Sequence, residues 1–227
     1  MTFTLSEAES RRIVSRHGVS VSPFVTATTT AEAVTATVQD DQLSFPVVAK
    51  LCGRTIAHKT ERGLVRLRIS DVESLRLACD ELLAAATVAD GPVELLVSSM
   101  VDGSRELIAG VTRDPQYGLV VMLGLGGIFA EAIRDAAFRL VPISEVDASD
   151  LIDDLANQRM LGALRGEPAV ERDALVDTLL ALASTATEVP GVVSIDLNPL
   201  IIADGVPVAV DALIELDDTI DDRGNDT

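Results

Sequence analysis

Lysine is scarce in this sequence. Of its 18 basic residues only Lys50 and Lys59 are lysines, and they enclose a single short segment. A lysine ammonium is a compact charge that can approach a phosphate, and arginine does not replace it at every site. Because arginine supplies the positive charge elsewhere, the segment from Lys50 to Lys59 is a candidate site. Drift in composition that spared two lysines explains the pattern equally well.

Cysteines, aromatic residues and long apolar runs are also few. Cys52 and Cys79 are too few for a disulfide framework and too far apart for a CxxC motif. Aromatic residues make up 3% of the chain and hydrophobic residues 48%, so the core must consist of Ala, Val, Leu and Ile. No apolar run approaches the ~20 residues that a membrane helix needs, and the first residues lack the basic and apolar pattern of a secretory signal. We expect a cytoplasmic protein with reduced thiols.

Positive charge is scarce overall, and the net charge is −18. Nucleic acids and anionic membranes would both be repelled, so we expect neither as a partner. A length of 227 residues suffices for one large domain or two small ones, each with a buried core.

The hydrophobic pattern predicts helices and strands in blocks. Capping signals at Ser6–Glu9, Thr29–Glu32 and Ser70–Glu73 predict the first three helices. Two further helices are expected over 145–157 and 171–188, and strands over 45–51, 65–69, 93–100, 106–112, 118–123, 138–143, 192–197, 200–203 and 206–214. Blocks of this kind favour an α+β fold with two subdomains. The expected domain spans 1–216, with about 1–20 and 93–216 in one subdomain and about 21–92 in a smaller one, and 217–227 is an acidic flexible tail.

The first patch that could carry chemistry contains both lysines and a histidine. The apolar run 45–51 predicts a buried strand that ends near Lys50, where an ammonium can meet a nucleotide phosphate. His58 follows in a loop flanked by glycines, and a neutral imidazole there can act as a nucleophile or phosphate carrier. A single histidine in a loop is more often a surface residue.

Two further patches follow. In the run Gly124–Gly127, backbone amides without Cβ atoms nearby can approach a phosphate, although a tight turn would use the same residues. Asp196 and Asn198 lie two residues apart on a predicted strand and therefore share a face. With Asp211 from a neighbouring strand they would form a set of oxygen ligands suited to Mg²⁺. Acidic strand ends that face water are the alternative.

Together, in this order, the patches resemble the ATP-grasp β subunit of NDP-forming acyl-CoA synthetases, the ADP-forming acetate–CoA ligase group related to succinyl-CoA synthetase. The segment 45–50 is similar to the strand YPVVLK of that family, and 56–60 to its loop I-x-HK[ST]. The segment 106–118 resembles E-x-I-x-G-V-x-R-D-P-x-F-G, and GLGGIFAE at 124–131 matches as it stands. The resemblance covers nearly all of residues 5–216.

The resemblance implies an ATP-grasp fold whose two subdomains clasp Mg²⁺ with ATP or ADP. It implies that Lys50 contacts phosphates, that His58 is catalytic and relays a phosphoryl group to ADP, and that a CoA-binding α subunit carrying a phosphohistidine is the partner. The remaining implied positions are nucleotide-binding Glu106, Val97, Ser98, Ser99 and Met100, phosphate-facing Lys59, Gly126, Gly127 and Arg165, and metal-binding Asn198, Asp211 and Asp196.

Two positions depart from the family pattern. Ser98-Ser99-Met100 stands where the family commonly has Gln-Glu-Met, which removes a carboxylate from the hinge. Leu64 replaces the second glycine of the HK loop. Because a Cβ narrows the allowed backbone angles, we expect this change to impair closure of the loop over a phosphate.

We therefore expect the nucleotide-binding subunit of an ADP-forming acyl-CoA synthetase, which interconverts acyl-CoA, ADP and phosphate with a carboxylic acid, CoA and ATP. One alternative is a non-catalytic ATP-grasp module that binds a nucleotide or a partner and regulates it. Another is an ATP-grasp ligase that joins a carboxylate to an amine through a free acyl phosphate. That ligase would not need His58.

Overall fold

The structure is a computed structural model that describes residues 1–56, 59–127, 133 and 135–218. Its contacts divide the chain into two units. The large unit comprises Met1–Thr4, Glu9–Val21 and Val101–Thr227, and the small unit comprises Leu5–Ala8 and Ser22–Met100. Each unit has its own sheet and helices and is described by itself.

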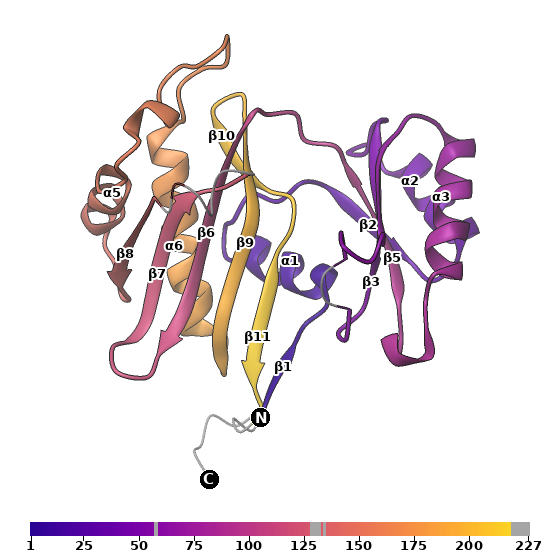
Figure 1. Cartoon of the computed structure of the whole chain (residues 1–227), viewed down its shortest axis with the longest axis horizontal. Coiled ribbons are helices and arrows are strands. Elements are labelled where there is room, and N and C mark those ends of the chain that lie inside the picture. The colour runs from indigo at the N-terminus through magenta and orange to yellow at the C-terminus, as the bar shows by residue number, and fades with distance from the viewer. Residues whose placement is uncertain (57–58, 128–132, 134, 219–227) are drawn as a thin grey trace. The chain divides into compact units, whose positions relative to one another are not determined.

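In its described part, the large unit is built on a seven-stranded antiparallel sheet (Figure 1). The strand order is β1-β11-β9-β6-β7-β8, and β10 pairs with β9 beside this path. The strands are β1 (Thr2–Thr4), β6 (Arg105–Asp114), β7 (Gly118–Leu125), β8 (Ala136–Leu140), β9 (Val192–Ala203), β10 (Val206–Ala209) and β11 (Leu213–Asp217).

The two faces of this sheet differ in composition. One face carries buried side chains such as Leu107, Leu123 and Ile195. Helix α6 (Arg172–Glu188) contacts strands β6, β7, β9 and β10, and α5 (Glu145–Asp153) packs against α6 and β8. The strand register places Glu106 and Asp196 on the opposite face, because Glu106 pairs with Ile201 and Asp196 with Gly110. The predicted site residues of these strands therefore lie on the face away from the buried core.

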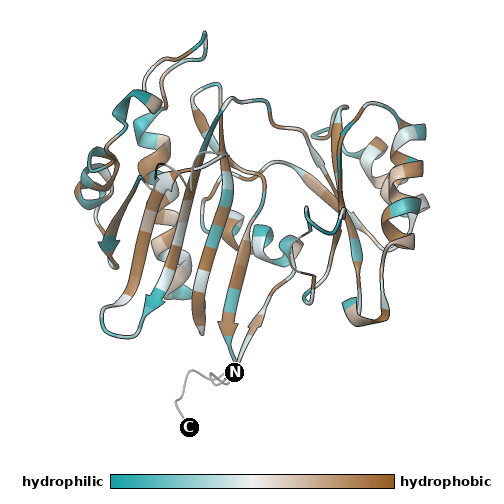
Figure 2. Ribbon diagram, viewed as in Figure 1, coloured by the Kyte–Doolittle hydropathy of each residue, from teal (hydrophilic) through white to brown (hydrophobic). Residues whose placement is uncertain are grey.

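The small unit has a four-stranded antiparallel sheet in the order β2-β5-β3-β4. Its strands are β2 (Phe24–Ala27), β3 (Val47–Cys52), β4 (Val65–Ile69) and β5 (Glu94–Ser99). Helices α2 (Thr30–Gln39) and α3 (Val72–Ala84) pack on the sheet, and a short 3₁₀ helix, η1 (Val88–Asp90), precedes β5. Figure 2 shows mostly apolar strands in both sheets and hydrophilic stretches along α3 and α5.

Local signals account for the helix starts. The capping box of Thr29 and Glu32 opens α2, and Asp71 caps α3 through the Ser74 amide at 2.8 Å. Helix α1 (Glu7–Arg16) ends before Gly18, whose φ is +106°. Helix α5 stops at Asp153 and is shorter than the predicted 145–157, because a second 3₁₀ helix, η2 (Gln158–Met160), follows it.

Several strands differ from the prediction. β1 and β2 were not predicted, and the predicted strands 192–197 and 200–203 form the single strand β9. The segment predicted as 206–214 is instead a pair, β10 and β11. β5 pairs with β2 and β3, so residues 93–100 belong to the small unit and not to the large one as expected. Of the expected tail 217–227, Asp217 ends β11 and 219–227 lie outside the described residues.

Cys52 and Cys79 are both buried and form no disulfide, as predicted. Burial raises the pKa of the Cys79 thiol to about 11, with a smaller contribution from the Asp80 carboxylate. Within the described residues, no helix is long and apolar enough to cross a membrane.

Candidate nucleotide and metal site

Lys50 lies on β3 of the small unit, as the apolar run 45–51 predicted. Every residue of β3 is buried, and Lys50 itself is only 7% exposed. The ammonium is held by the Glu7 carboxylate, because Lys50 Nζ donates to Glu7 Oε1 at 2.7 Å. A buried charge requires such a partner, since desolvation otherwise costs several kcal/mol, on the order of the penalties measured for isolated ions.

Glu7 brings both lysines of the chain together. Lys59 Nζ donates to Oε2 of the same carboxylate, so the two oxygens of Glu7 each accept from a different lysine. Glu7 is 2% exposed, and the Cys52 thiol lies 3.7 Å from Oε2. The structure therefore places two cations and one buried anion in a single cluster within the small unit, which we call the Glu7 cluster.

The segment that carries Lys59 is folded back on itself. Leu64 N donates to Lys59 O at 2.8 Å, and Leu51 N donates to Leu64 O at 3.0 Å. Leu64 is 1% exposed, belongs to the hydrophobic core of the small unit and has no positive φ. The left-handed conformation in this loop belongs to Gly63, with φ +66°, so Leu64 fits the described backbone, and its effect on closure over a phosphate stays a prediction. His58, the predicted catalytic residue, lies outside the described residues.

The predicted hinge residues occupy the end of β5 and the position after it. The side chain of Val97 is 1% exposed and packs in the core, so it cannot meet a ligand directly. Ser98 is also buried. Ser99 N donates to Pro23 O at 3.1 Å and Met100 N donates to Pro46 O at 3.3 Å, while Ser99 Oγ donates to Gln42 O at 3.3 Å. The segment is thus tied to the backbone on both of its sides.

In the large unit, Glu106 lies against the glycine run. Gly126 N donates to Glu106 O at 2.8 Å, and a Cβ on Gly126 would come within 3.0 Å of Leu107 O. Gly127 has φ +76°, and a Cβ there would lie 3.6 Å from Glu106 Oε2. The close approach to backbone explains glycine at position 126, and the positive φ explains glycine at position 127. Gly124 and Leu125, which we expected in a loop, instead end β7.

The predicted metal ligands Asp196, Asn198 and Asp211 come together on β9 and just before β11 in the large unit. Asp196 and Asn198 are two residues apart on β9, and Leu213, two residues after Asp211, pairs with Asp196. The surrounding protein and then the Asp211 carboxylate raise the pKa of Asp196, although the Asn198 side chain hydrogen-bonds to it and opposes the shift.

This donor set fits a hard divalent cation. Two carboxylates that repel each other and one amide beside them supply the oxygen ligands that Mg²⁺ takes in proteins. A cation between the carboxylates would remove the repulsion that raises the pKa of Asp196. Among the described residues, no group of three or more His, Cys, Asp or Glu side chains surrounds a common point, so the amide is an integral member of the set.

Arg165 lies on a tight turn in the connection between α5 and α6. It has φ +51°, Gly166 has φ +89°, and Leu164 and Glu167 exchange backbone hydrogen bonds across the turn. Arg105, which is 2% exposed, holds this connection by donating to Gly162 O at 2.9 Å and to Glu167 Oε2 at 3.2 Å.

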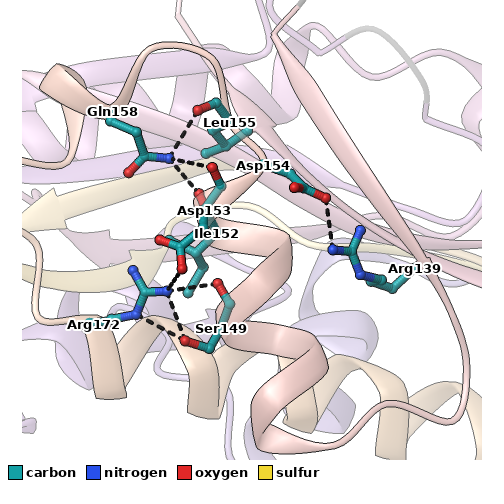
Figure 3. Close-up of polar contacts among 8 residues, drawn as sticks. All are labelled: Arg139, Ser149, Ile152, Asp153, Asp154, Leu155, Gln158 and Arg172. Atoms are coloured by element: carbon teal, nitrogen blue, oxygen red, sulfur yellow. Dashed lines mark hydrogen bonds and ion pairs between the residues drawn. The ribbon is translucent and has the colours of Figure 1, made fainter.

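Both ends of the same connection are anchored (Figure 3). At its start, Gln158 Nε2 donates to the carbonyls of Ile152 and Leu155 at 2.7 and 2.9 Å, which satisfies the end of α5. At its other end, Arg172 donates to Ser149 O at 2.7 Å and pairs with Asp153 at 2.6 Å. The backbone that presents Arg165 is therefore fixed at several points.

The sequence analysis did not identify Glu7 as a site residue. Its position in a capping sequence, Ser6–Glu9, offered a local explanation. The sequence did indicate that such a residue exists, because a lysine that follows a fully apolar run needs a carboxylate partner when it is buried. No carboxylate lies next to Lys50 in the sequence, so the partner had to come from a distant segment.

The chain was then compared with known proteins. Residues 2–216 match the ATP-grasp domain family. The chain is 34% identical over 211 residues to subunit beta of ADP-forming acetate–CoA ligase I from Pyrococcus furiosus, covering 92% of this chain and 90% of that one. Subunit beta of acetate–CoA ligase II from the same organism is 33% identical over 217 residues, with the same coverage. The ADP-forming acetate–CoA ligase I of Archaeoglobus fulgidus is 33% identical over 196 residues, which are 85% of this chain but 28% of that protein.

Solved structures agree with this result. A dinucleotide-forming acetyl-coenzyme A synthetase 1 from Ca. Korarchaeum cryptofilum, in complex with coenzyme A and Ca-AMPCP, superposes with a TM-score of 0.86 at 32% identity and covers 95% of this chain and 94% of that one. A second structure of it contains coenzyme A and Mg-AMPPCP, with its phosphohistidine segment pointing towards the nucleotide-binding site. Its TM-score is 0.80 at 33% identity, over 94% of this chain and 93% of that one. The chain belongs to the ATP-grasp family and is homologous to the β subunits and ATP-grasp domains of ADP-forming acyl-CoA synthetases.

Proposed function

We propose that this chain is the nucleotide-binding subunit of an ADP-forming acyl-CoA synthetase that converts acyl-CoA, ADP and phosphate into a carboxylic acid, CoA and ATP. The observation that carries the proposal is the Glu7 cluster, in which the chain's two lysines share one buried carboxylate. Phosphoryl transfer requires cationic groups in fixed positions and a metal ion more than it requires covalent chemistry from the protein.

In this proposal Lys50 and Lys59 bind phosphate oxygens, and Glu7 keeps both ammonium groups charged and in place. Glu106, Gly126, Gly127 and Arg165 line the nucleotide and phosphate positions on the large unit. The hinge from Val97 to Met100 contributes through its backbone, since the Val97 side chain is buried in the core.

Asp196, Asn198 and Asp211 hold Mg²⁺ in this proposal. A bound Mg²⁺ would neutralise phosphate charge and orient the phosphate oxygens. The two carboxylates supply the charge, and the Asn198 amide supplies a neutral oxygen ligand. Asp211 lies two residues before Leu213, which pairs with Asp196, and this proximity supports the assignment.

The partner is an α subunit that binds CoA and carries the phosphohistidine, and His58 relays the phosphoryl group to ADP. This assignment rests on the homologous subunits named beta and on the match of residues 56–60 to the family loop. With such an α subunit, His58→Ala should abolish turnover and leave Mg·ADP binding intact. Turnover that survives His58→Ala would favour an ATP-grasp ligase that works through a free acyl phosphate.

The direct test is the melting temperature of the chain with and without Mg·ADP. Ligand at about 100 times its dissociation constant adds roughly 2.7 kcal/mol, which is a rise of about 5–11 °C for a chain of this size. Asp211→Ala should abolish the magnesium-dependent part of the rise, and Asp177→Ala, at an exposed position of α6 in the same unit, should leave it unchanged. No rise for the wild-type chain, or a rise that survives Asp211→Ala, would contradict the proposal.

A further inference from the structure

The connection between β3 and β4, residues 53–64, is tied to the turn around Asp90 from both sides. Arg62 donates to the Asp90 carboxylate through two nitrogens, Nη1 to Oδ1 at 2.7 Å and Nη2 to Oδ2 at 2.9 Å. On the other limb, Thr55 Oγ1 donates to the Asp90 backbone carbonyl at 2.6 Å. One residue therefore holds two points of the connection that lie on either side of His58 in the sequence.

The Asp90 carboxylate is itself fixed. It is 4% exposed, lies on η1 and accepts from both Thr87 N and Thr87 Oγ1 at 2.8 Å. The Arg62 guanidinium and the Thr87 donors hold the pKa of Asp90 well below its usual range. A buried carboxylate that accepts four hydrogen bonds is a rigid anchor, and the paired guanidinium geometry defines the orientation of Arg62 as well as its distance.

Backbone contacts extend the attachment. A Cβ on Gly53 would lie 3.0 Å from Pro92 O, so the start of the connection runs directly against the backbone between Asp90 and β5. Ile56 and Leu64 are both buried in the core of the small unit. Lys59 stands between these attached points, and its carbonyl accepts from Leu64 N.

Resting on the proposed function, we infer that Arg62, Asp90 and Thr55 form a clamp that positions Lys59 for the terminal phosphate of ATP. Arg62 and Asp90 are positioning residues because they reach the nucleotide only through Lys59. If the Arg62–Asp90 ion pair served stability alone, the connection between β3 and β4 would not need attachments on both sides of His58. The clamp thus holds the backbone around Lys59, while Glu7 holds the Lys59 ammonium.

The clamp predicts a selective change in nucleotide affinity. Arg62→Met in the full-length chain should weaken Mg·ATP about tenfold, the size of one lost charged hydrogen bond, and should change Mg·ADP less than about twofold. Lys59→Met should do the same. Because Arg62 acts through Lys59, the double variant should be no weaker than Lys59→Met alone. Isothermal titration calorimetry measures the affinities of the wild type and the three variants for Mg·ATP and Mg·ADP.

Two controls separate positioning from stability. Arg76→Met removes an exposed arginine of α3 whose distance to Glu73 is 3.9 Å, and it should change neither affinity. Arg62→Lys retains the charge but not the paired geometry and should recover part of the ATP affinity. Equal weakening of Mg·ATP and Mg·ADP by Arg62→Met, or additive effects in the double variant, would overturn the inference in favour of a structural ion pair.

Amide hydrogen exchange tests the clamp without any nucleotide. Arg62→Met should speed exchange of the Gly63 and Leu64 amides, which donate to Thr60 O and Lys59 O, while amides of β6 and β7 remain unchanged. If the wild-type chain binds neither nucleotide, the proposed function fails. The exchange rates of the Gly63 and Leu64 amides then show whether Arg62 holds the loop. Unchanged exchange at these amides would overturn it.

Discussion

Glu7→Gln removes the charge from the Glu7 cluster with almost no change in volume. The glutamine amide can still accept one hydrogen bond, but Lys50 and Lys59 lose their shared anion. The side chains of Lys50, Lys59 and Glu7 are 9%, 16% and 1% exposed, so water cannot replace it. Removing one member of a buried ion pair costs about 3–5 kcal/mol, because the remaining charge is left uncompensated. We expect a loss of that size, equivalent to a fall of about 6–20 °C in melting temperature.

The matched control is Glu81→Gln. Glu81 pairs with Arg66 at 3.1 Å in the same unit, but the two side chains are 49% and 35% exposed. Exposed pairs contribute about 0.2–1 kcal/mol, so the control should lower stability by no more than that. Urea unfolding of both variants beside the wild type measures the difference in stability.

A further variant makes the reasoning refutable. Lys50→Met combined with Lys59→Met and Glu7→Gln removes all three charges, and apolar side chains in place of a buried ion pair are often neutral or stabilising. The triple variant should therefore be more stable than Glu7→Gln alone. If Glu7→Gln costs no more than Glu81→Gln, or if the triple variant is less stable still, the lysines do not depend on Glu7 for compensation.

Three other predictions follow from the same structure. Leu64→Ala should cost about 2–5 kcal/mol in urea unfolding, because the residue is 1% exposed in the core. The pKa of Asp90 is lowered, chiefly by Arg62, so the Asp90 carboxylate stabilises the fold fully above the unfolded carboxyl pKa of about 3.9 and loses this effect as the pH falls below that value. The difference in unfolding free energy between the wild type and Asp90→Asn should therefore shrink as the pH falls below about 3.9. Asp211→Asn should lower the pKa of Asp196 towards its usual value, which carbon-detected NMR titration measures.

Elements with a local cause could be predicted from the sequence. The Thr29 and Glu32 side chains form the capping box that the sequence indicated, and the all-apolar run before Lys50 is a buried strand. Strand β9 could not be predicted as one element, because Pro199 lacks the N–H that a strand normally donates. The sheet accommodates it with a register shift between Leu107 and Ala109 on the neighbouring β6.

Strand pairing explains the error at the boundary of the small unit. Residues 93–100 follow the turn signal Asp90-Gly91-Pro92, which suggested that a new subdomain begins there. β5 instead lies between β2 and β3, and β2 is only four residues long. The neighbours of β5 are far away in the sequence, and β2 is short. The residues of β5 therefore carry no local signal of the sheet to which the strand belongs.

The position of Glu7 has the same kind of cause, and it bears directly on function. Glu7 lies 43 residues before Lys50 and 52 before Lys59, so only the folded small unit brings the three together. Burial on β3 removes the Lys50 ammonium from water, which costs free energy unless another group compensates the charge. A carboxylate at 2.7 Å offsets the desolvation and aligns the ammonium at the same time. Glu7, whose place in the sequence suggested only a helix start, is thus the residue that compensates the buried lysine to which we assign phosphate binding.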